Sequence, residues 1–80
     1  MKPGRPWRYS GGRWLAVLRY RTDERGLLAI TAGYEPRPGR VLYWVRNWVT
    51  RSYSEGSTLT EEEAKAVCEG YALAYDSCGA

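Results

Sequence analysis

The sequence has no histidine and no phenylalanine, and it has only two cysteines, Cys68 and Cys78. Histidine is the usual general base near neutral pH and the commonest metal ligand in proteins. Two thiols without histidine complete neither a tetrahedral zinc site nor a Cys–His catalytic pair. The composition therefore excludes a self-contained zinc site, and we expect the protein to hold no metal and no cofactor.

Other catalytic arrangements are missing too. Without histidine, a serine nucleophile needs a lysine as its base. The only lysines are Lys2, near the start of the chain, and Lys65, on a polar helix face. The clustered carboxylates belong to one helix start and do not face each other across a cleft. We therefore expect a binding protein and not an enzyme.

Long apolar runs are absent as well. No segment approaches the roughly 20 apolar residues that span a bilayer, and residues 1–7 lack the apolar core of a signal peptide. Two cysteines alone also fall short of the disulfide framework that stabilises small secreted proteins. We expect a cytoplasmic protein that does not bind membranes.

The state of the two cysteines stays open at the level of the sequence. Free thiols fit a cytoplasmic protein, and ten helical residues would separate Cys68 from Cys78 by about 15 Å, too far for a disulfide. If the tail folds back over the helix, however, the two can pair, and an exposed Cys78 can instead link two chains. The protein is expected to be either a monomer or a homodimer.

The residues that are present fit one small folded domain of 80 residues, 44% hydrophobic and 26% charged. Residues 1–12 hold prolines and glycines around Trp7-Arg8-Tyr9 and show no periodicity, which predicts an irregular N-terminal arm. Residues 13–80 are expected to form a single α+β domain. In it, a small antiparallel sheet of three or four strands packs against a C-terminal helix.

Two strands of that sheet are well marked. The aromatic and branched run from Trp14 to Tyr20 predicts the first, and residues 23–26 supply turn chemistry after it. Residues 27–34 place alternate apolar side chains on one face and predict the second strand. The prolines within residues 35–39 end it, because proline cannot donate to a strand ladder.

Residues 41–53 fit two structures. Their valines, tyrosines and tryptophans favour strand, either as one long twisted strand or as two strands kinked near Arg46-Asn47. Their spacing also fits an amphipathic helix, because Arg46 shares a strand face with Trp44 and Trp48 and breaks strict alternation. We favour strand, with the helix as the alternative.

The last element is a helix that runs to about Asp76. Thr60 and Glu63 have the spacing of a capping box, in which the two side chains satisfy free backbone amides. Glu61 and Glu62 also lie where the helix dipole favours negative charge. Apolar residues that recur at helical spacing are expected to face the sheet. They are Ala64, Val67, Cys68, Tyr71 and Tyr75.

Charge is divided unevenly along the chain. Residues 1–53 carry a net charge of +8 and residues 54–80 carry −5, which together give the net charge of +3. Such a division indicates an interaction role, since one part can dock on an anionic surface and the other on a cationic one. The acidic residues of the helix either serve its start alone or present carboxylates to a basic groove that normally holds phosphates.

Arginines alternate with aromatic residues along the basic part, and these residue types are enriched at interface hot spots and in nucleic-acid-binding grooves. On the first strand, Arg19 and Arg21 share a face opposite Trp14, Leu18 and Tyr20, which predicts a basic sheet face. The plainer interpretation is that the tryptophans fill a small core and the arginine stems cover its edges. The candidate partner-binding residues are Arg8, Arg19, Arg21, Arg46, Arg51, Tyr53, Glu62 and Glu69.

The layout of hairpin strands and one capped C-terminal helix, over residues 13–76, resembles the small proteins that phages and mobile elements encode against host machinery. The strand runs Trp14 to Tyr20 and Leu27 to Tyr34 and the helix start at Thr60 carry this resemblance, which is closest to the single-domain anti-CRISPR inhibitors. It rests on layout and not on a shared motif, so no functional residue is carried over. It implies a non-enzymatic protein in a bacterial cytoplasm that binds a CRISPR-Cas effector complex and blocks target DNA binding.

Two other functions follow from the same residues. A basic sheet face can bind DNA or RNA directly, with an affinity that falls steeply with salt. The other is a structural or assembly role in a phage or mobile element. The expected partner is a host protein or nucleoprotein complex, such as a CRISPR-Cas effector, or a nucleic acid.

Overall fold

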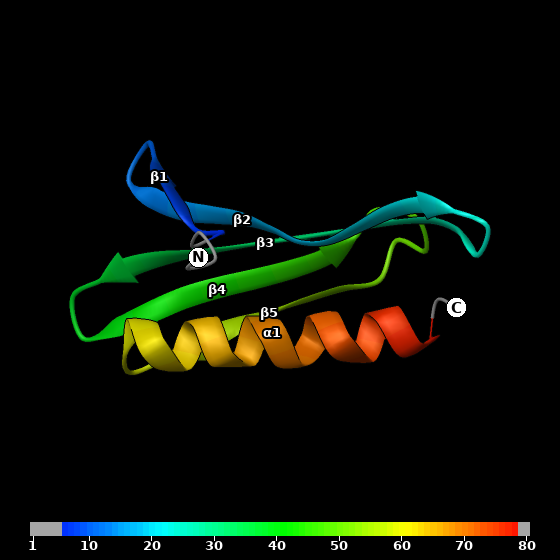
Figure 1. Ribbon diagram of the computed structural model, residues 1–80. Helices are drawn as coiled ribbons and strands as arrows, with labels where there is room; N and C mark the ends of the chain where they lie inside the picture. Colours follow the sequence, from blue (N-terminus) through cyan, green and yellow to red (C-terminus); the bar gives the residue numbers. More distant parts are fainter. Residues whose placement is uncertain (1–5, 79–80) are drawn as a thin grey trace, which may run out of the picture.

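The computed structural model describes residues 6–78, which form an antiparallel sheet with one helix packed against it (Figure 1). The strands are β1 (Arg8–Ser10), β2 (Arg13–Asp23), β3 (Gly26–Arg37), β4 (Arg40–Asn47) and β5 (Tyr53–Thr58), and the helix is α1 (Glu61–Cys78). Each strand pairs with the next along the chain. The predicted α+β fold is confirmed, with five strands in place of three or four.

The first strand corrects the prediction of an irregular arm over residues 1–12, of which residues 1–5 lie outside the described part. β1 pairs with β2 through a two-residue turn at Gly11 and Gly12, whose positive φ angles of 59° and 87° glycine adopts without strain. Trp7 packs edge-on against Tyr34, with 5.1 Å between the ring centroids. The two glycines therefore form a hairpin turn, and Trp7 belongs to the packed domain.

The last strand was not marked in the sequence, because small and polar residues fill most of β5 and have little strand preference. Its six residues are all paired with β4. Gly56 leaves room there for the ring of Tyr43, whose oxygen would lie 2.7 Å from a Cβ at this position. β5 therefore forms a strand because it pairs with β4 and packs closely against Tyr43, although its residues have little strand preference.

Residues 41–47 form strand and residues 48–52 form a loop, so the helical alternative is wrong. β4 ends at Asn47, at the predicted break near Arg46-Asn47, but β5 begins only at Tyr53, so the expected second strand directly after the break is wrong. Asn47 is fully buried, and its Oδ1 accepts hydrogen bonds from the backbone amides of Val49 (2.9 Å) and Thr50 (3.2 Å). The chain turns at this point because Asn47 supplies the acceptor that the loop amides need.

A bulge in β2 changes the face on which its side chains lie. The register with β3 shifts between Val17 and Arg19, so Leu18 is an extra residue. As a result, Trp14 before the bulge and Arg19 and Arg21 after it all lie on the face that α1 covers. The expected alternation, which places the two arginines opposite Trp14, is wrong for this reason.

The core lies between α1 and that face of the sheet. Ala64, Cys68 and Ala72 recur at one-turn intervals and are fully buried, and their small side chains allow the helix to approach the sheet closely. Of the other predicted contact positions, Val67 and Tyr75 are half-buried and Tyr71 is exposed. The buried strand residues are Ala16, Leu18, Leu28, Ile30, Ala32, Tyr34, Val41 and Val45.

The predicted capping box is present at the start of α1. Thr60 Oγ1 accepts a hydrogen bond from the amide of Glu63 at 3.1 Å, and Glu63 Oε1 accepts one from the amide of Thr60 at 3.1 Å. The same carboxylate accepts a third bond from the amide of Leu59 at 3.1 Å. The helix therefore begins where the sequence predicts.

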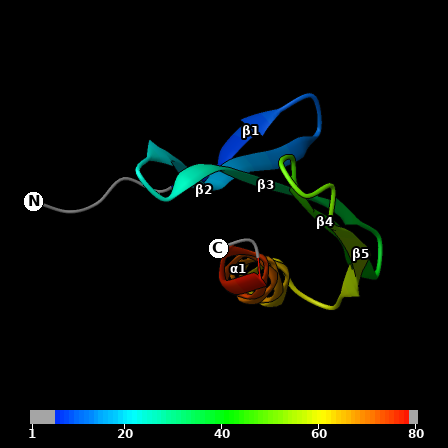
Figure 2. The same cartoon turned by 90° about the vertical axis from the view of Figure 1, so that its right-hand side faces the viewer.

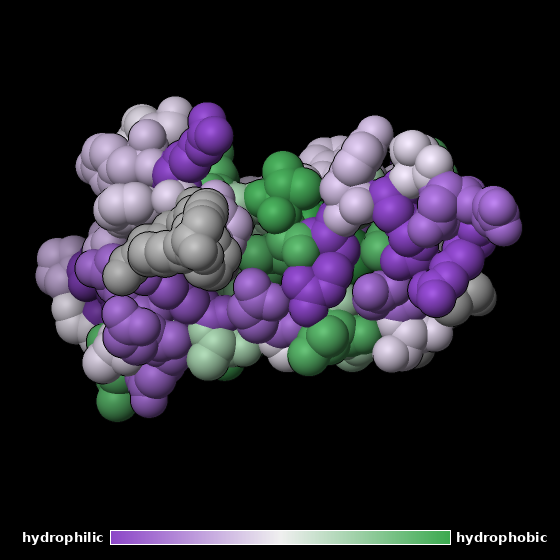
Figure 3. All heavy atoms as spheres, in the orientation of Figure 1, coloured by the Kyte–Doolittle hydropathy of each residue, from purple (hydrophilic) through white to green (hydrophobic). Residues whose placement is uncertain are grey.

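Viewed along the helix, the sheet curves over α1, so that one sheet face is covered and the other faces away (Figure 2). β1 lies on the far side of β2 from the helix in both views. Hydrophobic side chains gather near the middle of the face in Figure 3, where sheet and helix meet, with hydrophilic ones toward both ends. No helix among the described residues combines the length and the apolar character needed to cross a membrane.

Candidate functional site

We call the sheet face that α1 does not cover the open face. Residues directly opposite one another in an antiparallel sheet share a face, so the strand register gives its rows. The central row is Arg8, Leu15, Gly33, Trp44 and Glu55, flanked by Val17, Thr31, Arg46 and Tyr53 on one side and by Arg13, Glu35, Leu42 and Ser57 on the other. Val17 is 59% exposed and Tyr53 is 44% exposed. The open face thus combines apolar, aromatic and basic groups within reach of a partner.

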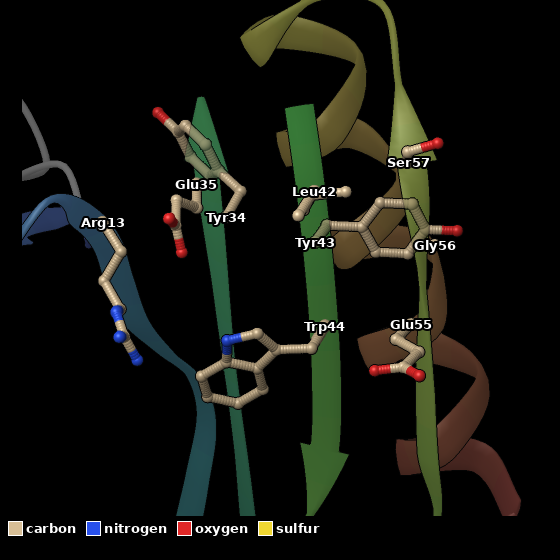
Figure 4. A pocket seen from close by; sticks show the side chains of 9 residues that line it. All are labelled: Arg13, Tyr34, Glu35, Leu42, Tyr43, Trp44, Glu55, Gly56 and Ser57. Atoms are coloured by element: carbon tan, nitrogen blue, oxygen red, sulfur yellow. The ribbon is translucent and has the colours of Figure 1, made fainter. Parts of the chain in front are cut away.

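Trp44 lies flat across the neighbouring strand at the centre of the open face. Gly33 on β3 makes this possible, because a Cβ there would lie 2.6 Å from Trp44 Nε1 and 2.9 Å from a methyl carbon of Leu15. Figure 4 shows the indole extending from β4 over β3 toward the strand that carries Arg13. One face of the half-buried ring therefore rests on the sheet, and the other faces outward.

Two grooves meet at Trp44. The smaller has a volume of about 540 Å³ (Figure 4) and the larger about 770 Å³, and Trp44 and Arg13 line both of them. Further side chains of the smaller groove are Glu35, Leu42, Glu55 and Ser57. Further side chains of the larger groove are Arg8, Ser10, Leu15, Val17 and Thr31.

Arg46 forms a stacked group with two aromatic rings beside these grooves. Its guanidinium carbon lies 4.7 Å from the ring centroid of Trp48 and 4.8 Å from that of Tyr53. Trp48 Nε1 donates to Thr31 Oγ1 at 2.7 Å, and the Tyr53 hydroxyl donates to Glu55 at 3.0 Å. Desolvation, and then this hydrogen bond, raises the pKa of Tyr53. The contacts hold exposed groups in one arrangement, which reduces the entropy lost on binding.

A second charged group lies on the covered face, where β2 meets the C-terminal half of α1; we call it the junction. Arg21 Nη1 lies 3.0 Å from Asp76 Oδ1, and Arg19 Nη1 lies 3.3 Å from Glu69 Oε1. The last helical turn contains no basic residue, and the helix dipole disfavours a carboxylate there. The two arginines offset this effect. Some of the basic residues of the first part of the chain therefore form ion pairs with acidic residues of the last part.

Replacing Asp76 with asparagine is expected to lower the free energy of unfolding by about 1 kcal/mol, because a partly exposed carboxylate near Arg19 and Arg21 loses its charge. The loss should shrink as the ionic strength rises. Glu24→Gln is the matched control, since Glu24 is exposed in the β2–β3 turn and forms no ion pair within residues 6–78. Urea unfolding at low and high salt measures both variants, and equal losses would contradict a stabilising junction.

The structure divides the predicted partner-binding residues into three groups. Arg8, Arg46 and Tyr53 lie on the open face. Arg19, Arg21 and Glu69 form the junction. Arg51, in the loop before β5, and Glu62, on α1, are exposed elsewhere. Partner binding by any of them stays a prediction, and the junction residues have an internal role.

Cys68 is a buried free thiol, while the side chain of Cys78 lies outside the described part. Cys68 Sγ donates to the carbonyl oxygen of Trp44 at 3.8 Å. Burial, and then the charge of Glu69, raises the pKa of this thiol to about 12. Cys68 is therefore a core residue that stays protonated and unreactive near neutral pH.

In a Cys78→Ser background, Cys68 is expected to react with a thiol reagent at least about tenfold more slowly in the native protein than in denaturant. The folded pKa lies above the ordinary value of 9.0, so the thiolate forms only as the pH rises toward about 12. The slow native rate should therefore persist through neutral and mildly alkaline pH. Absorbance of the released chromophore follows the reaction, and equal native and denatured rates would show that the thiol is accessible.

The sequence did not single out Arg13, Gly33, Trp44 and Trp48 as site residues. Two signals were present. Trp44 and Trp48 share a strand face with Arg46, and a glycine inside a regular strand marks a position where another group approaches the backbone closely.

No group of three or more cysteine, aspartate or glutamate side chains within the described part could hold a metal ion. No protein-family model, curated protein or solved structure matches this chain. The function must therefore be inferred from the geometry and charge of the open face.

Proposed function

We propose that this protein is a non-enzymatic binding protein that docks through its open face on a nucleoprotein complex and keeps nucleic acid from that complex. The observation that carries the proposal is the preformed group of Arg46, Trp48 and Tyr53 beside the flat ring of Trp44. Tryptophan, tyrosine and arginine dominate the energies of many interfaces. Their mutual contacts here lower the entropy lost on docking.

Charge on the open face favours an anionic partner. Arg8 and Arg13 line its larger groove, which no acidic side chain of residues 6–78 lines. The two carboxylates of the smaller groove have partners: Glu35 pairs with Arg37 at 2.8 Å, and Glu55 accepts a hydrogen bond from Tyr53. Acidic residues are concentrated on α1, on the opposite side of the sheet. An anionic surface would therefore be attracted to the open face and not to the helix.

The resemblance to small anti-CRISPR inhibitors supplies the particular partner, a CRISPR-Cas effector complex in a bacterial cytoplasm. An inhibitor that acts by stoichiometric binding needs a docking surface and no catalytic residues. The protein would occupy the path that target DNA takes into the complex. A phage or a mobile element would encode it.

Co-elution with a purified effector complex and a gel shift of the target DNA test this proposal. The native protein is expected to co-elute and to abolish the shift at stoichiometric amounts, and Arg46→Ala to weaken inhibition by at least about tenfold. Arg25→Ala is the matched control, because Arg25 is exposed in the β2–β3 turn. Unchanged DNA binding without co-elution would overturn the proposal.

A further inference from the structure

We infer that the open face binds single-stranded nucleic acid directly, with Trp44 as a stacking surface for a base and with Arg8 and Arg13 as phosphate contacts. The inference rests on the proposed function, because it names the component of the nucleoprotein that the open face contacts. A single strand would then occupy the grooves beside Trp44.

The orientation of Trp44 supports its assignment as a stacking surface for a base. The ring lies directly over Gly33, where a Cβ would be 2.6 Å from Nε1, so the indole lies along the sheet before any ligand arrives. Its outward face is flat and lies where the two grooves meet. Proteins that bind single strands stack bases on such aromatic side chains, and each stacked base contributes about 1–3 kcal/mol.

The arginines beside the ring support the assignment of phosphate contacts. Arg13 lines both grooves, and Arg8 lines the larger one across from Trp44. Within residues 6–78 neither forms an ion pair, in contrast to Arg19 and Arg21 of the junction. Arginine binds phosphate through two parallel hydrogen bonds. These two guanidinium groups are therefore available to a phosphate backbone that passes along the β1–β2 side of a stacked base.

The same geometry favours a single strand over other anionic partners. In a duplex each base is covered by its neighbours, so a duplex offers phosphates to the arginines but no base face to Trp44. An acidic protein surface would match the charge but would leave the outward ring face without a flat partner. Grooves of about 540 and 770 Å³ on the open face are large enough for a nucleotide.

Fluorescence anisotropy with a labelled single-stranded DNA of about 12 nucleotides tests the inference. We expect micromolar or tighter binding at low salt, a steep loss of affinity with salt, and at least about tenfold weaker binding to the duplex of the same sequence. Binding to the duplex as tight as to the single strand would overturn the inference, since charge alone would explain it.

Two variants separate stacking from charge. Trp44→Leu is expected to weaken binding by at least about tenfold, and Arg13→Gln to weaken it and to reduce the salt slope by about one. Tyr71→Leu on α1 and Arg25→Gln in the β2–β3 turn are the matched controls and should bind like the native protein. Arg13 is exposed, so Arg13→Gln should leave the fold intact. Its effect on binding can therefore be interpreted even if Trp44→Leu disturbs the fold. Native-like binding by both Trp44→Leu and Arg13→Gln would overturn the inference.

The failure of this inference differs from the failure of the proposed function. Co-elution with the effector complex without any binding to the oligonucleotide would leave the proposed function intact and overturn the inference, with a protein component as the contact. Oligonucleotide binding without co-elution would overturn the proposed function and support the inference. Absence of both would overturn both.

Discussion

Replacing Asn47 with alanine is expected to lower the free energy of unfolding by about 2–4 kcal/mol. The side chain is fully buried at the end of β4. Its Oδ1 accepts hydrogen bonds from the amides of Val49 and Thr50, and alanine would leave both amides without this acceptor. Loss of each hydrogen bond costs about 1 kcal/mol, and loss of the fully buried side chain leaves a cavity that adds to this cost.

Urea unfolding followed by tryptophan fluorescence measures the effect of Asn47→Ala. Thr50→Ala is the control from the same loop, because Thr50 is exposed and, within residues 6–78, its hydroxyl interacts only with Ser52. We expect the control to change the free energy of unfolding by less than about 0.5 kcal/mol. If Asn47→Ala behaved like the control, the loop between β4 and β5 would not depend on this side chain.

Replacing Gly33 with alanine is expected to lower the free energy of unfolding by about 1–3 kcal/mol, because overpacking forces neighbouring side chains away. The new Cβ would lie 2.6 Å from Trp44 Nε1 and 2.9 Å from a Leu15 methyl carbon, so the indole must move. The same change should weaken oligonucleotide binding, since the stacking surface loses its support. Gly70→Ala is the control, because no atom lies within 4 Å of its Cβ position, and in a helix this change stabilises by up to about 1 kcal/mol.

A double-mutant cycle identifies the cause of the Gly33 effect. In a Trp44→Leu background, Gly33→Ala should cost at least about 1 kcal/mol less than in the native protein, since the clashing ring is gone. Chemical denaturation of the four proteins gives the coupling energy. Additive effects would mean that the cost arises from the contact with Leu15 or from the backbone of β3 and not from Trp44.

The elements with strong local signals could be predicted from the sequence. The capping box at Thr60 and Glu63 marked the start of α1, and the alternating residues of β3 marked its buried face. The capping box and the alternation both depend on residues that are close together in the sequence, so they can be recognised without the structure. The α+β fold follows from them.

The features set by contacts between distant residues could not be predicted. The bulge at Leu18 moves Arg19 and Arg21 to the covered face, and nothing in β2 alone reveals it. β5 forms because it pairs with β4, although its residues do not favour strand. For the same reason the charge division looked like two docking surfaces, whereas part of it is the junction.

The candidate site was hidden by the pattern that made β4 ambiguous. Val41 and Val45 face the core, while Trp44 and Arg46 lie on the open face. A strand that packs a core on one side and carries aromatic side chains on the other has no simple alternation of apolar and polar residues. The irregularity that favoured a helix is therefore the feature that defines the open face.

Titration of the ¹⁵N-labelled protein with a single-stranded oligonucleotide, followed by NMR chemical shifts, tests most directly whether the open face is the binding surface. We expect the indole N–H of Trp44 and the amides of Val17 and Thr31 to shift, while the amides of Ala64 and Ala72 on α1 stay in place. Shifts confined to α1, or no shift at Trp44, would contradict the assignment of binding to the open face.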